Sequence, residues 1–387
     1  MVARGGYLDV QPGSPAAIMP CPDACPGPAR RTLAVAAHAA NMQAMRLSIL
    51  DQSMIVSGRA PAESIRETVE LARLCDRLGY HRYWLTEHHN TDSVAGSAPE
   101  VLLGALAMAT TRIRLGAAGI MLPHYSSLKV AEQFRVLEAL APGRIDLGLG
   151  RAPGSDGRTA FALNPNAAQA AEHFPAQVRD VMAWVSGSEL AAGHPFRDVK
   201  AQPQGPGSPE IWVLGSSNYG AQVAAHFGLP YCFAYFFSEG LGAREAVDLY
   251  RDTYRPSERF PVPISAICVL AVTAETQAQA ERLYVPREVW RAERERGRFV
   301  PLPSPEEAEA YPFTEAELRR NAVLRGRALF GTPDVVRSRL TEVATELGVE
   351  EVAIVTPTHD PADRRRSYAL LAEAFGLLSQ PSALAAD

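Results

Sequence analysis

The feature that most constrains the fold is a regular alternation of short apolar runs with longer segments of helical spacing, between Met45 and Leu378. Several of the short runs are apolar at every position, which is typical of parallel strands that are covered by helices outside and packed against side chains inside. The runs predict eight strands, at residues 46–50, 80–85, 113–120, 145–149, 211–214, 229–236, 263–272 and 351–356. A helix is expected after each strand. Eight such units predict an α/β fold, a (β/α)8 TIM barrel.

The helical segments carry their own start and stop signals. Residues 62–78 repeat apolar side chains at helical spacing, with Pro61 before them and Gly79 after them, which are typical first and last positions of a helix. Further helices are expected at residues 98–110, 127–140, 167–185, from 218 through His226, 242–254, 332–347 and 360–378. The alternative is an open doubly wound sheet, but no glycine-rich dinucleotide fingerprint follows the first predicted strand.

The predicted barrel spans residues 45–378, with a tail at 379–387. Residues 274–330 are charged and helix-prone and form an insertion after the seventh strand. In a barrel this insertion would lie over the C-terminal mouth as a lid or a wall of the substrate site.

Residues 1–44 differ from the rest, because they are rich in proline and glycine and carry Arg30-Arg31 before an alanine-rich run. The basic pair lies too far inside the chain for a typical signal peptide. We therefore expect a disordered leader, or an upstream start with the true start at Met45, and a cytoplasmic protein.

Composition excludes several classes of protein. The 387 residues include 38 Lys and Arg against 43 Asp and Glu, and a net charge of −5 argues against nucleic-acid binding. No apolar run reaches the roughly 18 residues of a membrane span. Five cysteines at irregular spacing are typical of a reducing compartment. Cys75, Cys232 and Cys268 are expected as small buried residues, whereas Cys21 and Cys25 lack nearby partners for a zinc site.

Polar residues follow several of the predicted strands, where TIM barrels carry their active sites. Glu87-His88-His89 follows the second strand, and histidine moves protons near neutral pH. Asp51 and His124 follow the first and third strands and could complete a metal site with these histidines. A metal-dependent hydrolase is therefore an alternative, although we expect no metal.

A second cluster of residues is suited to a phosphate. Gly215, Ser216 and Ser217 stand between a short strand and a helix, where backbone N–H groups and the helix dipole favour an anion. Arg151 follows the fourth strand, and a guanidinium can bind a phosphate with two hydrogen bonds. Gly119 and Gly150 would let a flat ligand approach the backbone closely.

These motifs together resemble those of the bacterial luciferase-like flavin monooxygenases. The resemblance covers about residues 45–378 and is closest to stand-alone members, some of which tailor natural products. It rests on the segments Trp84–His89, Arg114–Pro123, Ala131-Glu132, Gly143–Arg151 and Gly331-Thr332-Pro333.

The resemblance implies a barrel that binds reduced FMN at its mouth. It implies that a separate flavin reductase supplies the reduced FMN, since no NAD(P)H motif is visible. Reaction of this flavin with O2 to a C4a-hydroperoxide would then oxygenate a small organic substrate, with an aromatic intermediate of antibiotic biosynthesis as one candidate. The resemblance also implies a homodimer. Family relatives use the deazaflavin F420 instead, so an F420-dependent oxidoreductase is a further alternative.

Site residues follow from the same resemblance. His88 matches the catalytic histidine, with His89 beside it. Ala118-Gly119 matches a cis peptide under the flavin ring, and Gly150 stands where the light-emitting subunit has a reactive cysteine, which would open space for a bulkier substrate. The other matched positions are the phosphate contacts Arg151 and Ser216, their neighbours Gly215, Ser217 and Tyr219, and the carboxylate Glu132 near the flavin pocket.

Overall fold

The computed structural model describes residues 45–377. The expectations for residues 1–44, including Cys21 and Cys25, and for the tail at 379–387 lie outside the described residues. Residues 45–377 contain nine strands: β1 (Arg46–Asp51), β2 (Arg82–Leu85), β3 (Arg114–Met121), β4 (Ile145–Gly150), β5 (Glu210–Gly215), β6 (Tyr231–Phe233), β7 (Ser265–Thr273), β8 (Leu329–Gly331) and β9 (Glu351–Val355).

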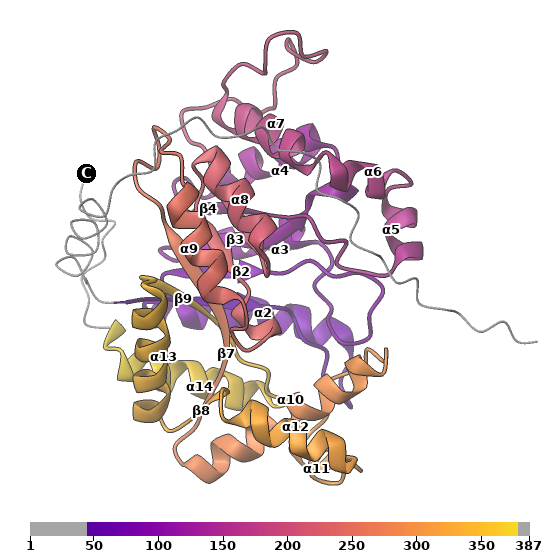
Figure 1. Ribbon diagram of the computed structural model, residues 1–387, viewed down its shortest axis with the longest axis vertical. Helices are drawn as coiled ribbons and strands as arrows, with labels where there is room; N and C mark the ends of the chain where they lie inside the picture. The colour runs from indigo at the N-terminus through magenta and orange to yellow at the C-terminus, as the bar shows by residue number, and fades with distance from the viewer. Residues whose placement is uncertain (1–44, 378–387) are drawn as a thin grey trace, which may run out of the picture. The chain divides into compact units, whose positions relative to one another are not determined.

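Eight of these strands close into a parallel barrel (Figure 1), which confirms the predicted fold. Each of β1 to β7 pairs in parallel with the next, and β9 pairs with both β7 and β1. The register of β3 against β4 shifts between Ala117 and Ile120, so the backbone is irregular at this point.

Helices surround the barrel: α2 (Pro61–Leu78), α3 (Pro99–Ala109), α4 (Ser127–Leu140), α5 (Gly157–Leu163), α6 (Ala167–Glu172), α7 (Phe174–Ser186), α8 (Asn218–Phe227), α9 (Ala243–Thr253), α10 (Gln277–Glu295), α11 (Pro305–Glu309), α12 (Glu315–Arg325), α13 (Pro333–Leu347) and α14 (Pro361–Ala374). Two 3-10 turns, η1 (Leu122–His124) and η2 (Tyr235–Phe237), follow β3 and β6. Within this part of the chain, no helix combines the length and apolar composition needed to cross a membrane.

Helix α2 shows how local signals set an element. Pro61 starts the helix, and Gly79 ends it with φ of 87°, a left-handed conformation that glycine adopts readily. Leu71, Ala72 and Cys75 are buried on one face of α2 and belong to the main core between helices and strands. Cys75, Cys232 and Cys268 are free and buried, as predicted.

A layer of buried charges fills the N-terminal end of the barrel interior. Arg82 is bound to both Asp146 and Glu351 at 2.8–2.9 Å, and the Trp84 indole N–H donates to Asp146 at 2.9 Å. These groups are buried and bound to one another, so the layer closes that end of the barrel. A ligand therefore has to approach from the C-terminal ends of the strands.

The sequence predictions differ from the structure in three places. The predicted helix at 167–185 is two helices, α6 and α7, and the loop before it contains α5. The predicted strand at 229–236 is only three residues long, because the chain turns into η2. The short strand β8 was not predicted; it pairs with the end of β7 and not with the rest of the barrel.

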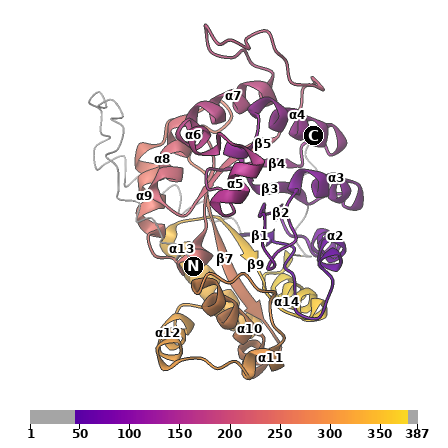
Figure 2. The ribbon, with the colours of Figure 1, turned by 90° about the vertical axis from the view of Figure 1, so that its right-hand side faces the viewer.

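The insertion after β7 comprises α10, α11, α12 and β8. The three helices lie together on one side of the barrel in two perpendicular views (Figure 1 and Figure 2). Residues of α10 line a cavity together with residues from the C-terminal ends of β1, β7 and β9, so the insertion does border the barrel mouth.

Candidate active site

Glu87 organises the loop that follows β2. Its side chain is fully buried and accepts hydrogen bonds from the Tyr125 hydroxyl at 2.7 Å and the Met121 backbone N–H at 3.0 Å. The His89 Nε2 atom lies 2.8 Å from the same carboxylate. One carboxylate therefore ties the loop after β2 to the end of β3. Sequence reasoning quoted Glu87 only as part of a motif, although a carboxylate directly after a barrel strand was a usable signal.

The two adjacent histidines have different surroundings. The His88 Nδ1 atom lies 3.1 Å from the Thr86 hydroxyl, and its backbone N–H donates to Gly96. Burial, and next the positive charge of Arg294, lower the pKa of His88 to about 4. His88 is consequently neutral near pH 7, when it can accept a proton. His89 instead is held by Glu87, so the two rings do not act as one pair.

Glycines of β3 and β4 pack closely against neighbouring backbone and against the Leu214 side chain. The peptide bond between Ala118 and Gly119 is cis, as the family resemblance implied. A Cβ atom on Gly119 would lie 2.7 Å from the Gly148 carbonyl oxygen, and one on Gly148 would lie 2.2 Å from the Ala117 carbonyl oxygen. Both positions therefore require glycine on grounds of space.

The space beside Gly150 is bordered by the Met121 side chain. A Cβ atom there would lie 3.3 Å from the Met121 sulfur, which is tighter than an ordinary van der Waals contact. The Met121 thioether thus occupies part of the space that the missing side chain leaves.

The predicted phosphate residues come together from two elements. The Arg151 guanidinium, after β4, lies 4.0 Å from the centroid of the Tyr219 ring in the first turn of α8. Ser217 is the residue before α8, and its side chain makes no capping hydrogen bond, so it leaves the first N–H groups of the helix without that partner. Ser216 and Ser217 are exposed beside Gly215. This arrangement suits an anion, because the free N–H groups, the helix dipole and a guanidinium act together.

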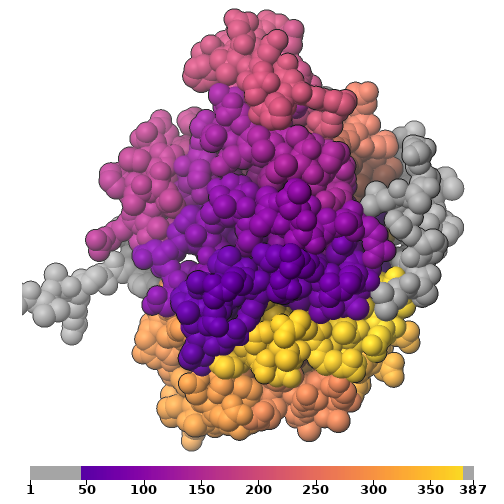
Figure 3. Space-filling view, turned by 180° about the vertical axis from the view of Figure 1, so that it is seen from behind, coloured from indigo at the N-terminus to yellow at the C-terminus, as the bar shows by residue number. Residues whose placement is uncertain are grey.

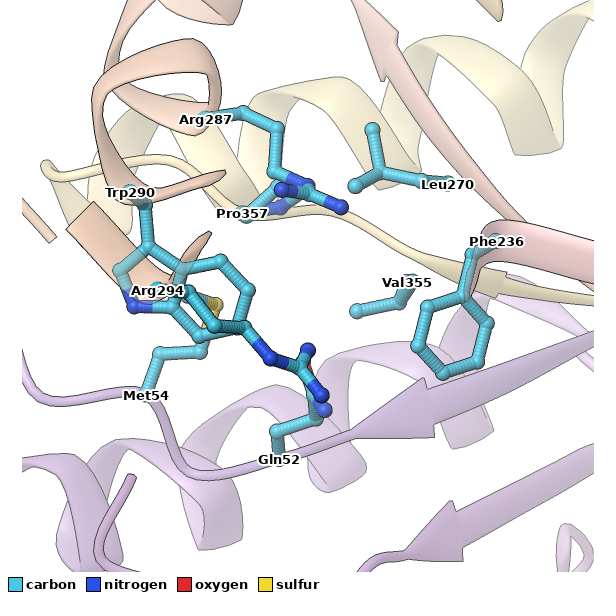
Figure 4. Close-up of a pocket in the computed structure, with 9 residues that line it drawn as sticks. All are labelled: Gln52, Met54, Phe236, Leu270, Arg287, Trp290, Arg294, Val355 and Pro357. Carbon is cyan, nitrogen blue, oxygen red and sulfur yellow. The ribbon is translucent and has the colours of Figure 1, made fainter. Parts of the chain in front are cut away.

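A narrow cavity opens between the strand ends and α10 (Figure 4). The space between its lining side chains, counted together with adjoining open solvent, is about 280 Å³. Its lining combines apolar and aromatic side chains with two guanidiniums: Gln52, Met54, Phe236, Leu270, Arg287, Trp290, Arg294, Val355 and Pro357.

The side chains considered for a metal site have other partners. The carboxylate of Asp51 accepts hydrogen bonds from Arg364 and Thr68, and Arg364, against the effect of burial, holds the pKa of Asp51 below its usual range. The His124 Nε2 atom lies 2.7 Å from the Pro153 carbonyl oxygen. Among residues 45–377, no group of three or more His, Cys, Asp or Glu side chains is arranged to hold a metal ion.

The sequence matches the family model for luciferase-like monooxygenases over residues 45–351. The chain belongs to the luciferase-like monooxygenase family. Its relatives include the N-acetyl-S-alkylcysteine monooxygenase of Bacillus subtilis, which is 38% identical over 85% of this chain and 98% of the relative. The crystal structure of apo-MsnO8 is 37% identical, with a TM-score of 0.78 over 87% of this chain and 99% of that chain.

More distant structures share the fold of this luciferase-like monooxygenase. The oxygenating constituent of 3,6-diketocamphane monooxygenase of Pseudomonas putida, solved with FMN, has a TM-score of 0.60 at 18% identity over 86% of this chain and 97% of that chain. An F420-dependent secondary alcohol dehydrogenase has a TM-score of 0.56 at 14% identity over 87% of this chain and all of that chain. The family and its monooxygenase relatives make the chain an oxidoreductase.

Most of the predicted site residues lie in two groups, and Glu132 belongs to neither. His88, His89 and the Ala118-Gly119 peptide lie at the ends of β2 and β3, and Arg151 lies on Tyr219 of α8. Glu132 stands apart: it is in the second turn of α4, its carboxylate is 3.9 Å from the Lys129 ammonium, and no hydrogen bond or ion pair among the described residues joins it to the others. The sequence analysis did not single out Arg287, Trp290 and Arg294. A tryptophan among regularly spaced arginines in the insertion was the pattern that could have indicated them.

Proposed function

We propose that the chain is an FMN-dependent monooxygenase that uses reduced FMN and O2 to oxygenate a small organic substrate. The observation that carries this proposal is the arrangement at the C-terminal ends of the strands. The Arg151 guanidinium lies on Tyr219 at the uncapped start of α8, and glycines of β3 and β4 pack closely beside the cis Ala118-Gly119 peptide. When bound, reduced FMN supplies the electrons that activate O2 for the transfer of one oxygen atom.

The residues fit the two ends of such a cofactor. Arg151, Ser216 and the first N–H groups of α8 would hold the phosphate, and Gly215, Ser217 and Tyr219 would shape the turn around it. The backbone at Ala118, Gly119 and Gly150 would lie against the flat ring system, because no side chain projects from the glycines. Glu132, whose carboxylate lies 3.9 Å from the Lys129 ammonium, would be the carboxylate near the flavin pocket that the family resemblance implies.

His88 is the residue that we propose to accept a proton at its imidazole nitrogen. It is neutral near pH 7, and the Thr86 hydroxyl at Nδ1 leaves Nε2 for the reacting group. Glu87 orients His89, which we propose as the positioning partner beside His88. Apolar lining at the cavity, such as Met54 and Phe236, would exclude water from the reaction.

The proposal includes two protein partners. A separate flavin reductase would supply reduced FMN through a transient contact. A second copy of the chain would pack on α3 and α4, where apolar side chains are exposed: Val101 by 72%, Met108 by 75%, Val136 by 47% and Leu140 by 48%. Figure 3 shows the face of the molecule to which the first, indigo-to-purple helices contribute. Exposed apolar patches of this kind mark interaction sites.

Replacement of Arg151 by alanine tests the cofactor assignment. We expect the dissociation constant for FMN to rise at least about 10-fold, since a charge-assisted bidentate contact contributes about 1.5–3 kcal/mol. The constant for riboflavin, which lacks the phosphate, should stay within about 2-fold, whereas the same change at the exposed Arg158 should alter neither. Flavin fluorescence quenching measures both ligands.

Two outcomes would contradict the proposal. If Arg151→Ala weakened the binding of FMN and of riboflavin equally, Arg151 would not bind the phosphate. Tight binding of F420 with no FMN binding, and no oxygenated product with O2 and a reductase, would favour the deazaflavin alternative.

A further inference from the structure

Arg287 of α10 is a buried cation that forms no ion pair with a carboxylate among residues 45–377. Its side chain is 6% exposed, and its Nε atom has no hydrogen-bond partner. No ion pair or hydrogen bond joins its guanidinium to any other described residue. The ring centroid of Trp290 lies 5.2 Å from the guanidinium carbon. The Glu239 carboxylate, which is paired with Arg291, acts on the charge of Arg287 without forming an ion pair with it. Arg287 therefore lines the cavity with no carboxylate bound to it directly among the described residues.

Other arginines of the insertion show that carboxylate partners are available. Arg291, one turn further along α10, is paired with Glu239, and Arg325 of α12 is paired with Glu288. Arg294 is exposed, unlike Arg287, but it also is paired with no carboxylate among residues 45–377. Its guanidinium carbon lies 5.7 and 5.8 Å from the ring centroids of Phe237 and Trp290. Arg287 and Arg294 both line the cavity.

A buried guanidinium without a partner lowers the stability of the fold, because the desolvation of the charge is not compensated. Burial and the nearby Arg291 lower the pKa of Arg287 to about 10, so the group is still charged near pH 7. An uncompensated charge of this kind is expected where a ligand supplies the opposite charge.

We propose that Arg287 and Arg294 bind the anionic group of the substrate, a carboxylate carried on an apolar or aromatic body. Both guanidiniums reach from α10 into one cavity, with Phe236 and Val355 on its other side (Figure 4). The guanidiniums would bind the carboxylate, and the rings of Trp290 and Phe236 would pack against the body. This inference rests on the proposed function, and it names the substrate class of that site.

An anion in this cavity could come from the flavin as well as from a substrate. The FMN phosphate is one source, and the electron-rich ring of reduced FMN is another. We favour the substrate, because Arg151 and the start of α8 already form a separate place for the phosphate. The test below separates these sources.

The test compares the binding of 3-phenylpropionate with that of 3-phenylpropionamide, its neutral counterpart of equal size. Calorimetry on the purified chain, with and without oxidised FMN, should show that the carboxylate binds at least about 10-fold more tightly than the amide. Arg287→Met and Arg294→Met should each reduce that ratio to below about 3-fold, and Arg287→Lys should keep part of it. Arg282→Met is the matched control: Arg282 also lies on α10 but is exposed and paired with Glu306 and Glu309, so the ratio should not change.

Other outcomes would overturn the inference. Equal affinity for the acid and the amide in the wild-type chain would show that no anion site exists. A loss of affinity for FMN or reduced FMN in Arg287→Met, with the ratio unchanged, would assign the charge to the flavin. A marked fall in the midpoint of thermal unfolding of Arg287→Met, together with an unchanged ratio of acid to amide affinity in Arg294→Met, would show that the charge of Arg287 stabilises the fold and does not bind substrate. Because the assay needs no turnover, a chain that fails to bind FMN but prefers the acid would contradict only the proposed function.

Discussion

At the scale of single residues, three consecutive side chains after β2 acquire three different environments. Glu87 is fully buried, and the His89 ring is hydrogen-bonded to its carboxylate. The His88 ring instead contacts the hydroxyl of Thr86. Burial suppresses the charged form of His88, and the cation Arg294 suppresses it further. The combination keeps an uncharged base at the barrel mouth.

Replacement of His88 by glutamine should lower the rate of substrate oxygenation about 10²–10⁴-fold, the usual contribution of a general base. FMN affinity should be unchanged, because no phosphate contact is lost. The measurement is product formation at saturating reduced FMN, and an unaltered rate would remove His88 from the mechanism.

The pH dependence of the wild-type rate follows from the same residue. The folded pKa of about 4 lies below the usual 6.5, so the neutral base persists through neutrality and is lost only as the pH falls through about 4. Glu87, His89 and Arg294 are the charged or titratable groups that act on it. Arg294→Met removes a cation, so the acid limb should move to higher pH. An acid limb near 6.5 in the wild type would contradict this account.

At the scale of elements, Gly331 determines how the insertion rejoins the barrel. It ends β8 and starts the turn into α13, with φ of 153°. A Cβ atom there would lie 2.8 Å from the Gln277 side-chain oxygen and 3.0 Å from a Val335 methyl group. Both the backbone conformation and the space therefore favour glycine.

Gly331→Ala should lower the free energy of unfolding by about 1–3 kcal/mol, since a side chain is forced into a sparsely populated conformation. The matched control is Gly104→Ala within α3, where a Cβ atom meets nothing within 4 Å. That change should raise the free energy of unfolding by about 0.5–1 kcal/mol, because alanine is the better helix former. Urea unfolding measures both free energies. An equal effect of the two changes would refute the claim that Gly331 is required for its conformation and space.

Element prediction succeeded where a local signal exists. Helix starts at Pro61, Pro99 and Pro333 could be read directly, because proline is tolerated in the first turn. Pro175 carried the same signal, and it explains why α7 begins anew after α6, although apolar spacing alone suggested one helix. Strand β8 has three residues and exists only because β7 extends beyond its barrel neighbours, so no local pattern could reveal it.

At the scale of the whole molecule, the exposed apolar side chains of α3 and α4 bear on assembly. Met108→Lys places a charge in this face, and we expect the proposed homodimer to dissociate at micromolar concentration, because burial of an unpaired ammonium is unfavourable. Light scattering coupled to gel filtration measures the mass. Val323→Lys is the control, because Val323 is 67% exposed on α12, away from this face. A wild-type chain that is monomeric, or a dimer that Met108→Lys leaves intact, would contradict the proposed interface.

The sequence by itself determined the barrel, the positions of most helices and the residues around its mouth, because each of these depends on periodicity or on short motifs along the chain. Only the tertiary structure decided which side chains meet. Glu87 binds groups 34 and 38 residues away, and Arg151 lies on a ring of another βα unit. Arg287 forms no ion pair with a carboxylate among residues 45–377, and its Nε atom has no hydrogen-bond partner there. Hydrogen bonds, ion pairs and their absence depend on segments that approach each other through space, and this information is not present in a local pattern.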